Sequence, residues 1–338
     1  MKIKINKIIS FLMIMGFSCV GMAQMETQFT QYMHNRLTFN PGYAGSSGSI
    51  CASVMYRNQW LGLQLDPPTP DYESGSTPVD YLFSFDMPVK FLHGGIGLTV
   101  FQDNIGYNSC FYGAFDYAFR IFWGPGNLSA GIEANIFNSS LDFQQLVGSS
   151  DFTGNYLDPV QSAGDPMLSG QSATDFLFDL STGLFYQVPG TYYLGISLKD
   201  VLAAKSTVLN RQNSRVLFIT GGYEYNLPAN PSFQLRPSFL IKTATLRTMQ
   251  VDLSCLLSYQ STFWGGISYR FQDAISVLAG LNWNHMQLGF SYDLTTSQYG
   301  GWKDGRSVGS LEAYLKYCFK VIIPPKLPSS YRGTLYLF

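Results

Sequence analysis

The chain has 338 residues, of which 13% are charged and 16% are aromatic, and its formal net charge is -1. Soluble domains carry about 25% charged residues, so this chain is poor in charge. The near-zero net charge argues against nucleic acid as a partner. No stretch beyond the N-terminus reaches the roughly 18 consecutive apolar residues of a membrane-spanning helix. Few charges and many aromatics without such a helix are typical of a membrane β-barrel.

The N-terminus has the pattern of a secretory signal peptide. Lysines precede a short apolar stretch, Ile8–Val20, and Gly21-Met22-Ala23 offers small residues at a cleavage site. We therefore expect residues 1–23 to be removed, which leaves Gln24 first. A lipidated Cys19 is disfavoured because the residues before it form a poor lipobox. A retained anchor is disfavoured because the apolar stretch is too short.

Residues 24–48 are expected to form a periplasmic segment ahead of the first strand. Within it, Asn40-Pro41-Gly42-Tyr43-Ala44-Gly45 is rich in turn-forming residues, which favours a tight periplasmic turn. The alternative is that Gln28–Gly45 folds into or under the barrel mouth and forms part of a partner surface. Asn40, Pro41 and Tyr43 are the candidate partner-binding residues of this segment.

Alternating side chains predict fourteen strands. In residues 108–122, Phe115, Tyr117 and Phe119 share one face, whereas Asp116 and Arg120 lie on the other. The recurrence of this pattern in segments of about ten residues favours lipid, and not a soluble core, as the neighbour of the apolar face. The expected strands are residues 49–60, 79–88, 93–103, 108–122, 126–137, 174–187, 190–200, 213–226, 232–242, 247–259, 262–271, 274–282, 285–294 and 308–320.

The connections between these strands are sorted by length. Long connections follow the first, fifth, seventh and thirteenth strands, and short ones follow every even-numbered strand from the second to the twelfth. The links after the third, ninth and eleventh strands, on the same side as the long ones, are also short. This layout predicts an all-β, transmembrane antiparallel barrel over residues 49–320, with long loops outside the cell and both termini in the periplasm. Residues 321–338 are expected to be a periplasmic tail. Their final residues also have the form of a closing strand, but the prolines at 324, 325 and 328 cannot pair within a sheet.

Charged side chains of both signs fall on the face opposite the apolar one. An Arg or Lys at the bilayer midplane would cost about 2–4 kcal/mol, so we expect these charges to face the lumen. Mixed signs favour paired networks in a plugged or narrow interior over an open pore lined by one sign. The expected lumen residues are Arg57, Asp86, Asp116, Arg120, Glu133, Asp179, Glu224, Arg236, Asp252, Arg270, Glu312 and Lys316.

Arg57-Asn58-Gln59-Trp60 ends the first strand at the expected outer rim. We interpret Trp60 as part of an aromatic girdle and Arg57 as a member of a lumen ion pair. The alternative is that Arg57, Asn58, Gln59 and Trp60 bind an extracellular client protein. The long connections Leu61–Pro78 and Asn138–Ala173 are the best candidates for a client-facing surface, since exposed loops carry function.

Metal and catalytic sites find little support in the sequence. The four cysteines beyond the signal peptide lie in expected strands without metal-ligand spacing, and we interpret them as small residues on strand faces. The alternative for two of them is a disulfide between Cys51 and Cys318, which requires the first and last strands to pair. The aspartates of Asn138–Ala173 fit no EF-hand. We expect no cofactor and no enzyme, although a Ser-His arrangement as in a membrane phospholipase stays open because three histidines are present.

Several spaced motifs carry a family resemblance. The chain resembles the PorP/SprF family of type IX secretion system outer-membrane proteins. It departs from that pattern at Arg36 and Leu37, which replace Asn-Pro, and at Val308-Gly309-Ser310, which replaces paired glycines. The motifs are Gln28-Phe29-Thr30-Gln31-Tyr32-Met33, Phe39 to Gly45, Tyr56 to Trp60, Asp273-Ala274-Ile275, Gly289 to Asp293, Thr295-Thr296-Ser297 and Leu311–Phe319.

The resemblance implies a fourteen-stranded barrel that works with other components of a type IX translocon. It implies help in secreting a large, adhesin-like surface protein, or in holding that client by its C-terminal domain, sometimes for gliding motility. It also implies a periplasmic partner related to OmpA-like peptidoglycan-binding proteins. A passive outer-membrane channel for small solutes is the alternative function.

Overall fold

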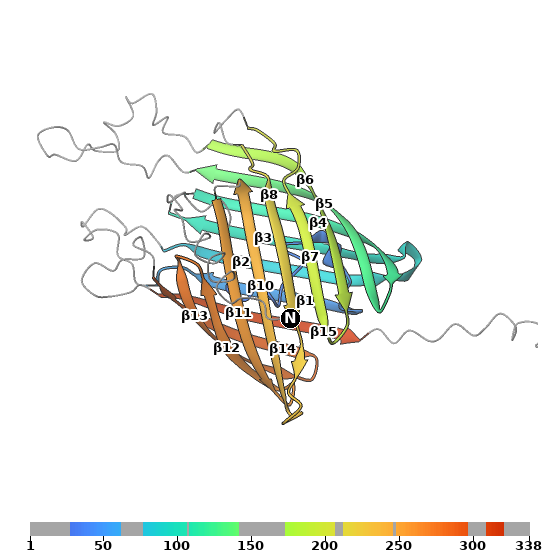
Figure 1. Cartoon of the computed structure of the whole chain (residues 1–338). Coiled ribbons are helices and arrows are strands. Elements are labelled where there is room, and N and C mark those ends of the chain that lie inside the picture. The colour runs from blue at the N-terminus through green and yellow to red at the C-terminus, as the bar shows by residue number, and fades with distance from the viewer. Residues whose placement is uncertain are drawn as a thin grey trace, which may run out of the picture.

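The chain closes into a ring of antiparallel strands (Figure 1). The computed structural model describes residues 28–61, 77–106, 108–141, 173–206, 212–245, 248–296 and 309–320. The strands are β1 (Ser49–Asn58), β2 (Val79–Val89), β3 (Gly94–Ile105), β4 (Asn108–Trp123), β5 (Gly126–Leu141), β6 (Ala173–Val188), β7 (Tyr192–Lys199), β8 (Val216–Tyr223), β9 (Tyr225–Asn226), β10 (Phe233–Thr245), β11 (Thr248–Tyr259), β12 (Phe263–Arg270), β13 (Ala274–Trp283), β14 (Met286–Thr295) and β15 (Gly309–Lys320). Two short 3-10 helices, η1 (Pro41–Tyr43) and η2 (Lys90–Leu92), complete the described elements.

The number of strands predicted from alternation is confirmed. β8 and β9 both pair with β10, so the fifteen described segments fill fourteen positions around the ring. The ring is closed because β1 pairs with β15 as well as with β2. The largest difference from the expected boundaries is in β5, which was expected to end at residue 137 and continues to Leu141.

The two faces of the wall differ as the alternation predicted. On β4, Phe115 is 53% exposed and its neighbour Asp116 is 0% exposed; on β5, Ile132 and Glu133 show the same contrast. Large apolar side chains therefore cover the outside, and polar side chains face inward. Such an outer surface is stable against hydrocarbon, where it needs no further protein to cover it.

The two ends of the barrel carry different connections. Tight turns follow β4, β6, β11 and β13 at the end where β1 begins, which we call the short-turn end. Gly124, in the two-residue turn after β4, has a left-handed φ of 58°, which glycine adopts without strain. The opposite, long-loop end carries the connections of residues 59–78, 142–172, 200–215 and 296–308. The side of the membrane that each end faces stays a prediction.

The N-terminal segment, residues 28–48, lies inside the barrel, and we call it the plug segment. Of our two interpretations, a tight periplasmic turn and folding into or under the barrel mouth, this position fits the second, since Pro41–Tyr43 forms η1, buried against β4, β5, β6 and β7. That the segment forms part of a partner surface stays a prediction. At the start of the segment, Gln28 bonds Gln250, which lies at the long-loop end of β11. At its other end, Arg120 of β4 holds it near the short-turn end. The segment thus runs the length of the lumen before β1 begins.

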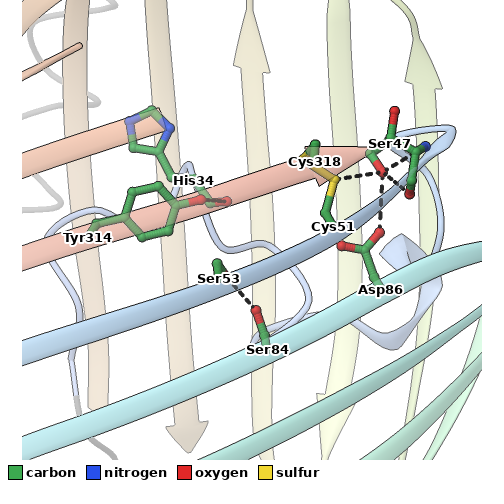
Figure 2. Close-up of a disulfide and its surroundings, with 9 residues drawn as sticks. His34, Ser47, Cys51, Ser53, Ser84, Asp86, Tyr314 and Cys318 are labelled. Carbon is green, nitrogen blue, oxygen red and sulfur yellow. Dashed lines mark hydrogen bonds between the residues drawn. A yellow bond between two sulfur atoms is a disulfide. The ribbon is translucent and has the colours of Figure 1, made fainter. Parts of the chain in front are cut away.

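The first and last strands are joined by a disulfide. β1 and β15 pair with Cys51 directly opposite Cys318, and their Cα atoms are 4.1 Å apart (Figure 2). The sequence left this disulfide open on the condition that the first and last strands pair, and that condition is met; the interpretation of Cys51 and Cys318 as small residues on a strand face was wrong. Cys255 carries a free thiol, and the buried Cys110 donates a hydrogen bond to Ser139. The pairing follows from the register of barrel closure, which the spacing of cysteines along the chain does not reveal.

Several expectations fall outside the described residues. These are the signal peptide at 1–23, the C-terminal tail at 321–338 and most of the connection Asn138–Ala173 with its aspartates. Across the part of the chain that the structure describes, no helix is long and apolar enough to cross a membrane.

Candidate functional site in the barrel lumen

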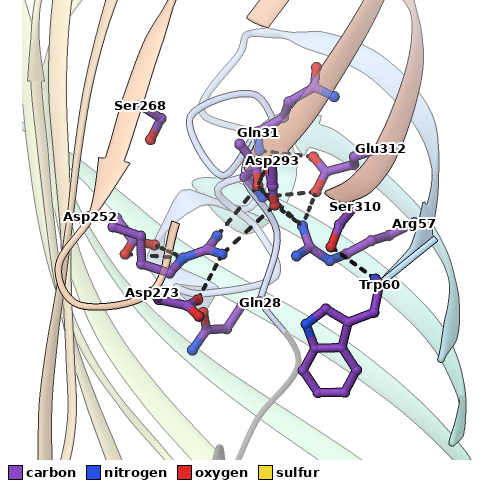
Figure 3. A network of polar contacts seen from close by, with 12 residues as sticks. Gln28, Gln31, Arg57, Trp60, Asp252, Ser268, Asp273, Asp293, Ser310 and Glu312 are labelled. Carbon is purple, nitrogen blue, oxygen red and sulfur yellow. Dashed lines mark hydrogen bonds and ion pairs between the residues drawn. The ribbon is translucent and has the colours of Figure 1, made fainter. Parts of the chain in front are cut away.

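A buried ion-pair network holds the start of the plug segment at the long-loop end (Figure 3). Arg57 of β1 pairs with Asp293 of β14 at 3.0 Å and with Glu312 of β15 at 3.2 Å. Arg270 of β12 lies 3.4 Å from Asp252 of β11 and 3.9 Å from Asp293. We call these five residues, together with Asp273, the arginine network. It links β1 with β11, β12, β14 and β15, across the place where the first and last strands close the ring.

Thr30 of the plug segment sits at the centre of the arginine network. Its backbone N–H donates to Glu312 Oε2 at 2.8 Å, and the N–H of Gln31 donates to Oε1 of the same carboxylate at 2.9 Å. The Thr30 hydroxyl donates to Asp293 and accepts from Arg57 Nη1 at 3.1 Å. Charged hydrogen bonds are about twice as strong as neutral ones, so the network fixes the plug segment by its backbone.

A second polar cluster holds the middle of the plug segment from the opposite wall. Lys199 of β7 donates to the carbonyl of Thr38 at 3.0 Å and lies 3.6 Å from Glu133 of β5. Tyr112 of β4 donates its hydroxyl proton to Glu133 at 2.6 Å. Ser197 donates to the carbonyl of Phe39. The buried carbonyls of the plug segment thus find donors on the wall, as buried backbone groups require.

Asn40 and η1 fit against the wall because glycines face them. The Asn40 amide donates to the carbonyl of Leu184 at 2.9 Å, and its Oδ1 accepts the N–H of Gly42 at 2.8 Å. A Cβ at Gly131 would lie 2.3 Å from the backbone nitrogen of Gly42. A Cβ at Gly183 would lie 2.2 Å from Asn40 Oδ1. These glycines leave the space that the plug segment occupies.

Aromatic side chains hold His34 and Arg36 between the two polar clusters. The His34 ring lies 4.7 Å from Trp264 and 5.4 Å from Tyr314, and Tyr314 donates to the His34 carbonyl at 3.1 Å. Arg36 lies 3.7 Å above the Tyr193 ring, a cation–π contact. Burial, with the positive charges of Lys316 and Arg36, lowers the pKa of His34 to about 3. His34 is therefore neutral at physiological pH.

The short-turn end of the plug segment is held by one arginine. Arg120 donates to the carbonyl of Ala44 at 2.9 Å, to that of Gly45 at 3.0 Å and to the hydroxyl of Ser46. It also donates to Ser129 on the neighbouring strand β5. Ser47, where the segment leaves the lumen, donates to Asp86 at 3.3 Å (Figure 2).

The lumen residues named from the sequence lie on the inner face of the wall or beside it. Glu224 lies between β8 and β9, and the others are in strands. Five of them form ion pairs: Arg57, Glu133, Asp252, Arg270 and Glu312. The buried members are Arg57, Asp86, Asp116, Glu133, Asp179, Asp252, Arg270 and Glu312, and the partly exposed ones are Arg120, Glu224, Arg236 and Lys316.

The candidate partner-binding residues divide into two groups. Asn40, Pro41, Tyr43 and Arg57 are buried within the barrel, where their side chains contact its wall or the arginine network. The others lie at the long-loop rim. Asn58 accepts a hydrogen bond from Thr77, and the backbone N–H of Trp60 donates to the Ser310 hydroxyl. Gln59 lines a cavity at the barrel mouth.

Four residues of the site were missed from the sequence. Asp293 and Asp273 were noted only within family motifs, and Asp273 falls in a turn, where alternation gives no signal. Asp80 and Lys199 lie at the ends of β2 and β7 and are 1% and 7% exposed. These four residues are identified only once the closed ring shows which side chains meet inside the lumen.

A cavity of about 410 Å³ lies above the plug segment at the long-loop end. Its polar lining includes Asp80, Thr99, Asp103, Lys199 and Asp200. Aromatic rings complete it, from the plug segment and from the wall: Phe29, Phe39, Phe101, Tyr112 and Phe137. The cavity combines acidic side chains with aromatic surface.

A closed ring with an apolar outside and a lumen filled by its own N-terminal segment defines a transmembrane β-barrel of the outer-membrane type. The family model of the type IX secretion system membrane protein PorP/SprF matches residues 21–317, so the chain belongs to that family. It is therefore an outer-membrane protein of the type IX secretion system.

Three solved structures similar to this chain illustrate the likeness. The outer membrane protein Omp33 of Acinetobacter baumannii has 6% identity and a TM-score of 0.44, over 80% of this chain and 99% of that one. A mutant porin of Rh. blastica has 8% identity and a TM-score of 0.31, over 80% and 99%. CdiB from Escherichia coli has 12% identity and a TM-score of 0.33, over 80% and 63%. A comparison with curated proteins found no match.

Proposed function

We propose that this barrel supports the secretion and cell-surface anchoring of a type IX client, an adhesin-like protein held by its C-terminal domain. The long-loop end faces outward and binds the client. The short-turn end faces the periplasm and contacts an OmpA-like peptidoglycan-binding protein. The barrel performs no catalysis itself; its role is to hold other components in place.

The filled lumen is the observation that supports this proposal most. The plug segment is held at three levels, by the arginine network, by Lys199 and by Arg120. A passive channel needs a continuous aqueous path, whereas buried backbone and aromatic side chains occupy the middle of this lumen. A barrel closed in this way serves as a rigid platform within the membrane, which suits an anchoring protein better than a solute pore.

Surface proteomics tests the anchoring role. A strain lacking the protein is compared with one that carries a version in which residues 142–172 are replaced by a short Gly-Ser turn. We expect both strains to lose the same large protein from the cell surface, because the client has lost its attachment. The barrel of the second strain should still be found in the outer membrane. Unchanged surface display in the strain without the protein would refute the anchoring role.

Co-purification identifies the partners that the proposal requires. The tagged barrel is extracted in detergent, and its bound proteins are identified by mass spectrometry. We expect a surface protein with a type IX C-terminal domain and a periplasmic peptidoglycan-binding protein. Planar-bilayer recording of the same preparation addresses the passive channel: large steady currents through the intact barrel would favour that function instead.

A further inference from the structure

Positive charge gathers in the lumen towards the short-turn end. Four basic side chains face the interior there, and we call them the basic vestibule: Arg36 of the plug segment, Arg120 of β4, Arg236 of β10 and Lys316 of β15. Each of them is partly exposed, whereas Arg57 and Arg270 of the arginine network are buried. Solvent therefore reaches the cations of the vestibule, and so can a dissolved ligand.

Two acidic side chains balance part of this charge. In the described part of the chain, the carboxylates of the short-turn half are Asp86 and Glu224. Glu224 attracts two of the arginines, and Asp86 attracts Arg120 and Lys316. Each carboxylate is thus shared between two cations, and the vestibule keeps a net positive charge.

Neutral groups accept the hydrogen bonds of the arginines in the basic vestibule. Arg36 donates to the carbonyl of Met33 at 3.1 Å and lies over the Tyr193 ring. Arg236 donates to the amide oxygen of Gln234 at 2.7 Å. Among the residues that the structure describes, none of the four cations takes part in an ion pair, in contrast to the arginine network. An anion would offer charged acceptors, and hydrogen bonds between ions are about twice as strong as neutral ones.

The placement of the cations selects the type of anion. Around the ring, three or four strands separate each of β4, β10 and β15 from the next, and neighbouring strands are about 4.8 Å apart. One phosphate ion therefore cannot contact all three parts of the wall. The wall also separates these side chains from the lipid outside, which argues against a lipid headgroup. Phe122 continues the inward series of β4 beyond Arg120 and is 93% exposed, so it offers an apolar contact at the same mouth.

We propose that the basic vestibule binds an acidic peptide segment of a partner protein, which enters the barrel from the short-turn end. Its carboxylates pair with Arg36, Arg236 and Lys316, and an apolar residue beside them packs against Phe122. That this partner is periplasmic rests on the function proposed above. The anion site itself rests only on the charges of the lumen.

Binding of a small peptide to the purified full-length barrel tests the site. The probe is acetyl-Glu-Gly-Glu-Gly-Glu-amide, and its matched control carries glutamine in place of each glutamate. Isothermal titration calorimetry in a non-ionic detergent gives the dissociation constants. We expect the glutamine peptide to bind at least about tenfold more weakly, because it lacks the charge that the vestibule attracts. Equal binding of the two peptides would overturn the proposal.

Substitutions locate the binding within the lumen. Arg236→Gln and Lys316→Gln should each weaken binding of the glutamate peptide about fivefold, since each removes a partly exposed charged partner. Lys242→Gln, on the same strand as Arg236 but at the long-loop end, should leave it unchanged. Heat-modifiable electrophoretic mobility shows that each variant is folded, and Lys316→Gln serves if Arg236→Gln is not. Peptide binding that survives both vestibule substitutions would refute the site.

Sodium phosphate in the same assay distinguishes a peptide from a small anion. We expect the peptide to stay bound in millimolar phosphate; full displacement by phosphate equimolar with the peptide would make this a phosphate site and overturn the proposal. The assay contains no partner protein, so its failure leaves the anchoring function standing. Conversely, unchanged client display in the strain without the protein would remove the function and leave the anion site intact.

Discussion

At the scale of single residues, the buried charges of the arginine network hold the plug segment because they are paired with one another. Arg57 and Glu312 are 3% and 0% exposed, and each makes contact with both the wall and Thr30. A buried ion pair contributes little net free energy compared with apolar residues of the same volume, but removing one partner leaves an uncompensated charge. The arginine network therefore specifies where the plug segment lies.

Glu312→Gln should destabilise the barrel by about 3 kcal/mol, because Arg57 loses one of its two charged partners and the N–H groups of Thr30 and Gln31 lose a charged acceptor. Urea unfolding in detergent, followed by tryptophan fluorescence, measures the change. Asp273→Asn is the matched control: the Asp273 side chain is 23% exposed, so water compensates Arg270 there and the cost should be much smaller. Equal costs in the two variants would contradict this account of the network.

Gly131→Ala should displace η1 from the wall, because the new methyl group would meet the backbone of Gly42 at 2.3 Å. Gly265→Ala is the control, since its nearest atom would be 3.5 Å away, an ordinary contact. Trypsin cleavage after Arg36 in the folded barrel reports displacement. We expect cleavage in Gly131→Ala only; resistance in both variants would show that the fit of η1 does not hold the segment.

His34 should make the stability of the filled barrel depend on pH. Its pKa is about 3 in the folded protein and about 6.5 when unfolded, so the unfolded chain binds the additional proton between these values. The stabilisation from a neutral His34 is therefore fully present above pH 6.5 and is lost as pH falls towards 3. In His34→Gln, the midpoint of urea unfolding should change less with pH over this range than it does in the wild type. An unchanged slope would contradict the assignment.

At the scale of elements, the seam between β1 and β15 is where the ring closes. Their ladder runs from the Ser49–Lys320 pair to the Asn58–Leu311 pair, and the disulfide lies near the short-turn end. The bond spans 267 residues, so it restricts the unfolded chain strongly.

Cys51→Ser should lower the stability of the barrel by about 2–5 kcal/mol, because the unfolded chain regains the freedom that the bond removed. The backbone ladder persists, so the variant should still fold and insert. Urea unfolding gives the change, and Cys255→Ser, which alters a free thiol, is the control. A wild-type protein insensitive to dithiothreitol in this measurement would show that the bond contributes nothing.

The strands were predictable from the sequence, whereas their relation to the plug segment was not. β4 and β5 show side-chain alternation over their full length, and this local signal fixes their faces. Residues 28–48 have no such period, since their contacts are set by the wall around them. Asn40 and Pro41 resemble turn residues in isolation, and only the facing glycines, Gly131 and Gly183, show that they belong inside the lumen.

Long-range register explains the other differences. The Cys51–Cys318 bond and the meeting of Asp80 with Asp103 depend on which strands are neighbours and at what offset. A shift of one residue would turn these side chains to the opposite face. The number of strands and the sorting of the loops by length are predictable from the sequence alone. The contacts between side chains within the lumen depend on how the ring closes.

At the scale of the whole molecule, the chain is an outer-membrane barrel of the PorP/SprF family whose N-terminal segment fills its own lumen. The filled lumen connects the residues described above with the proposed anchoring role. If the segment lay outside, the barrel would be open, and the passive channel would become the stronger interpretation. The position of the plug segment is thus the central claim.

Cross-linking in intact cells tests that claim most directly. Gln28 and Gln250 are hydrogen-bonded side chain to side chain, so cysteines at both positions should form a disulfide on mild oxidation. Gln28→Cys combined with Gln102→Cys, on the outer face of β3, is the control and should not be linked. Mass spectrometry of the linked peptides distinguishes these products from bonds to native cysteines. We expect the Gln28–Gln250 link in the folded barrel; its absence, with Gln28→Cys open to a soluble maleimide, would contradict a filled lumen.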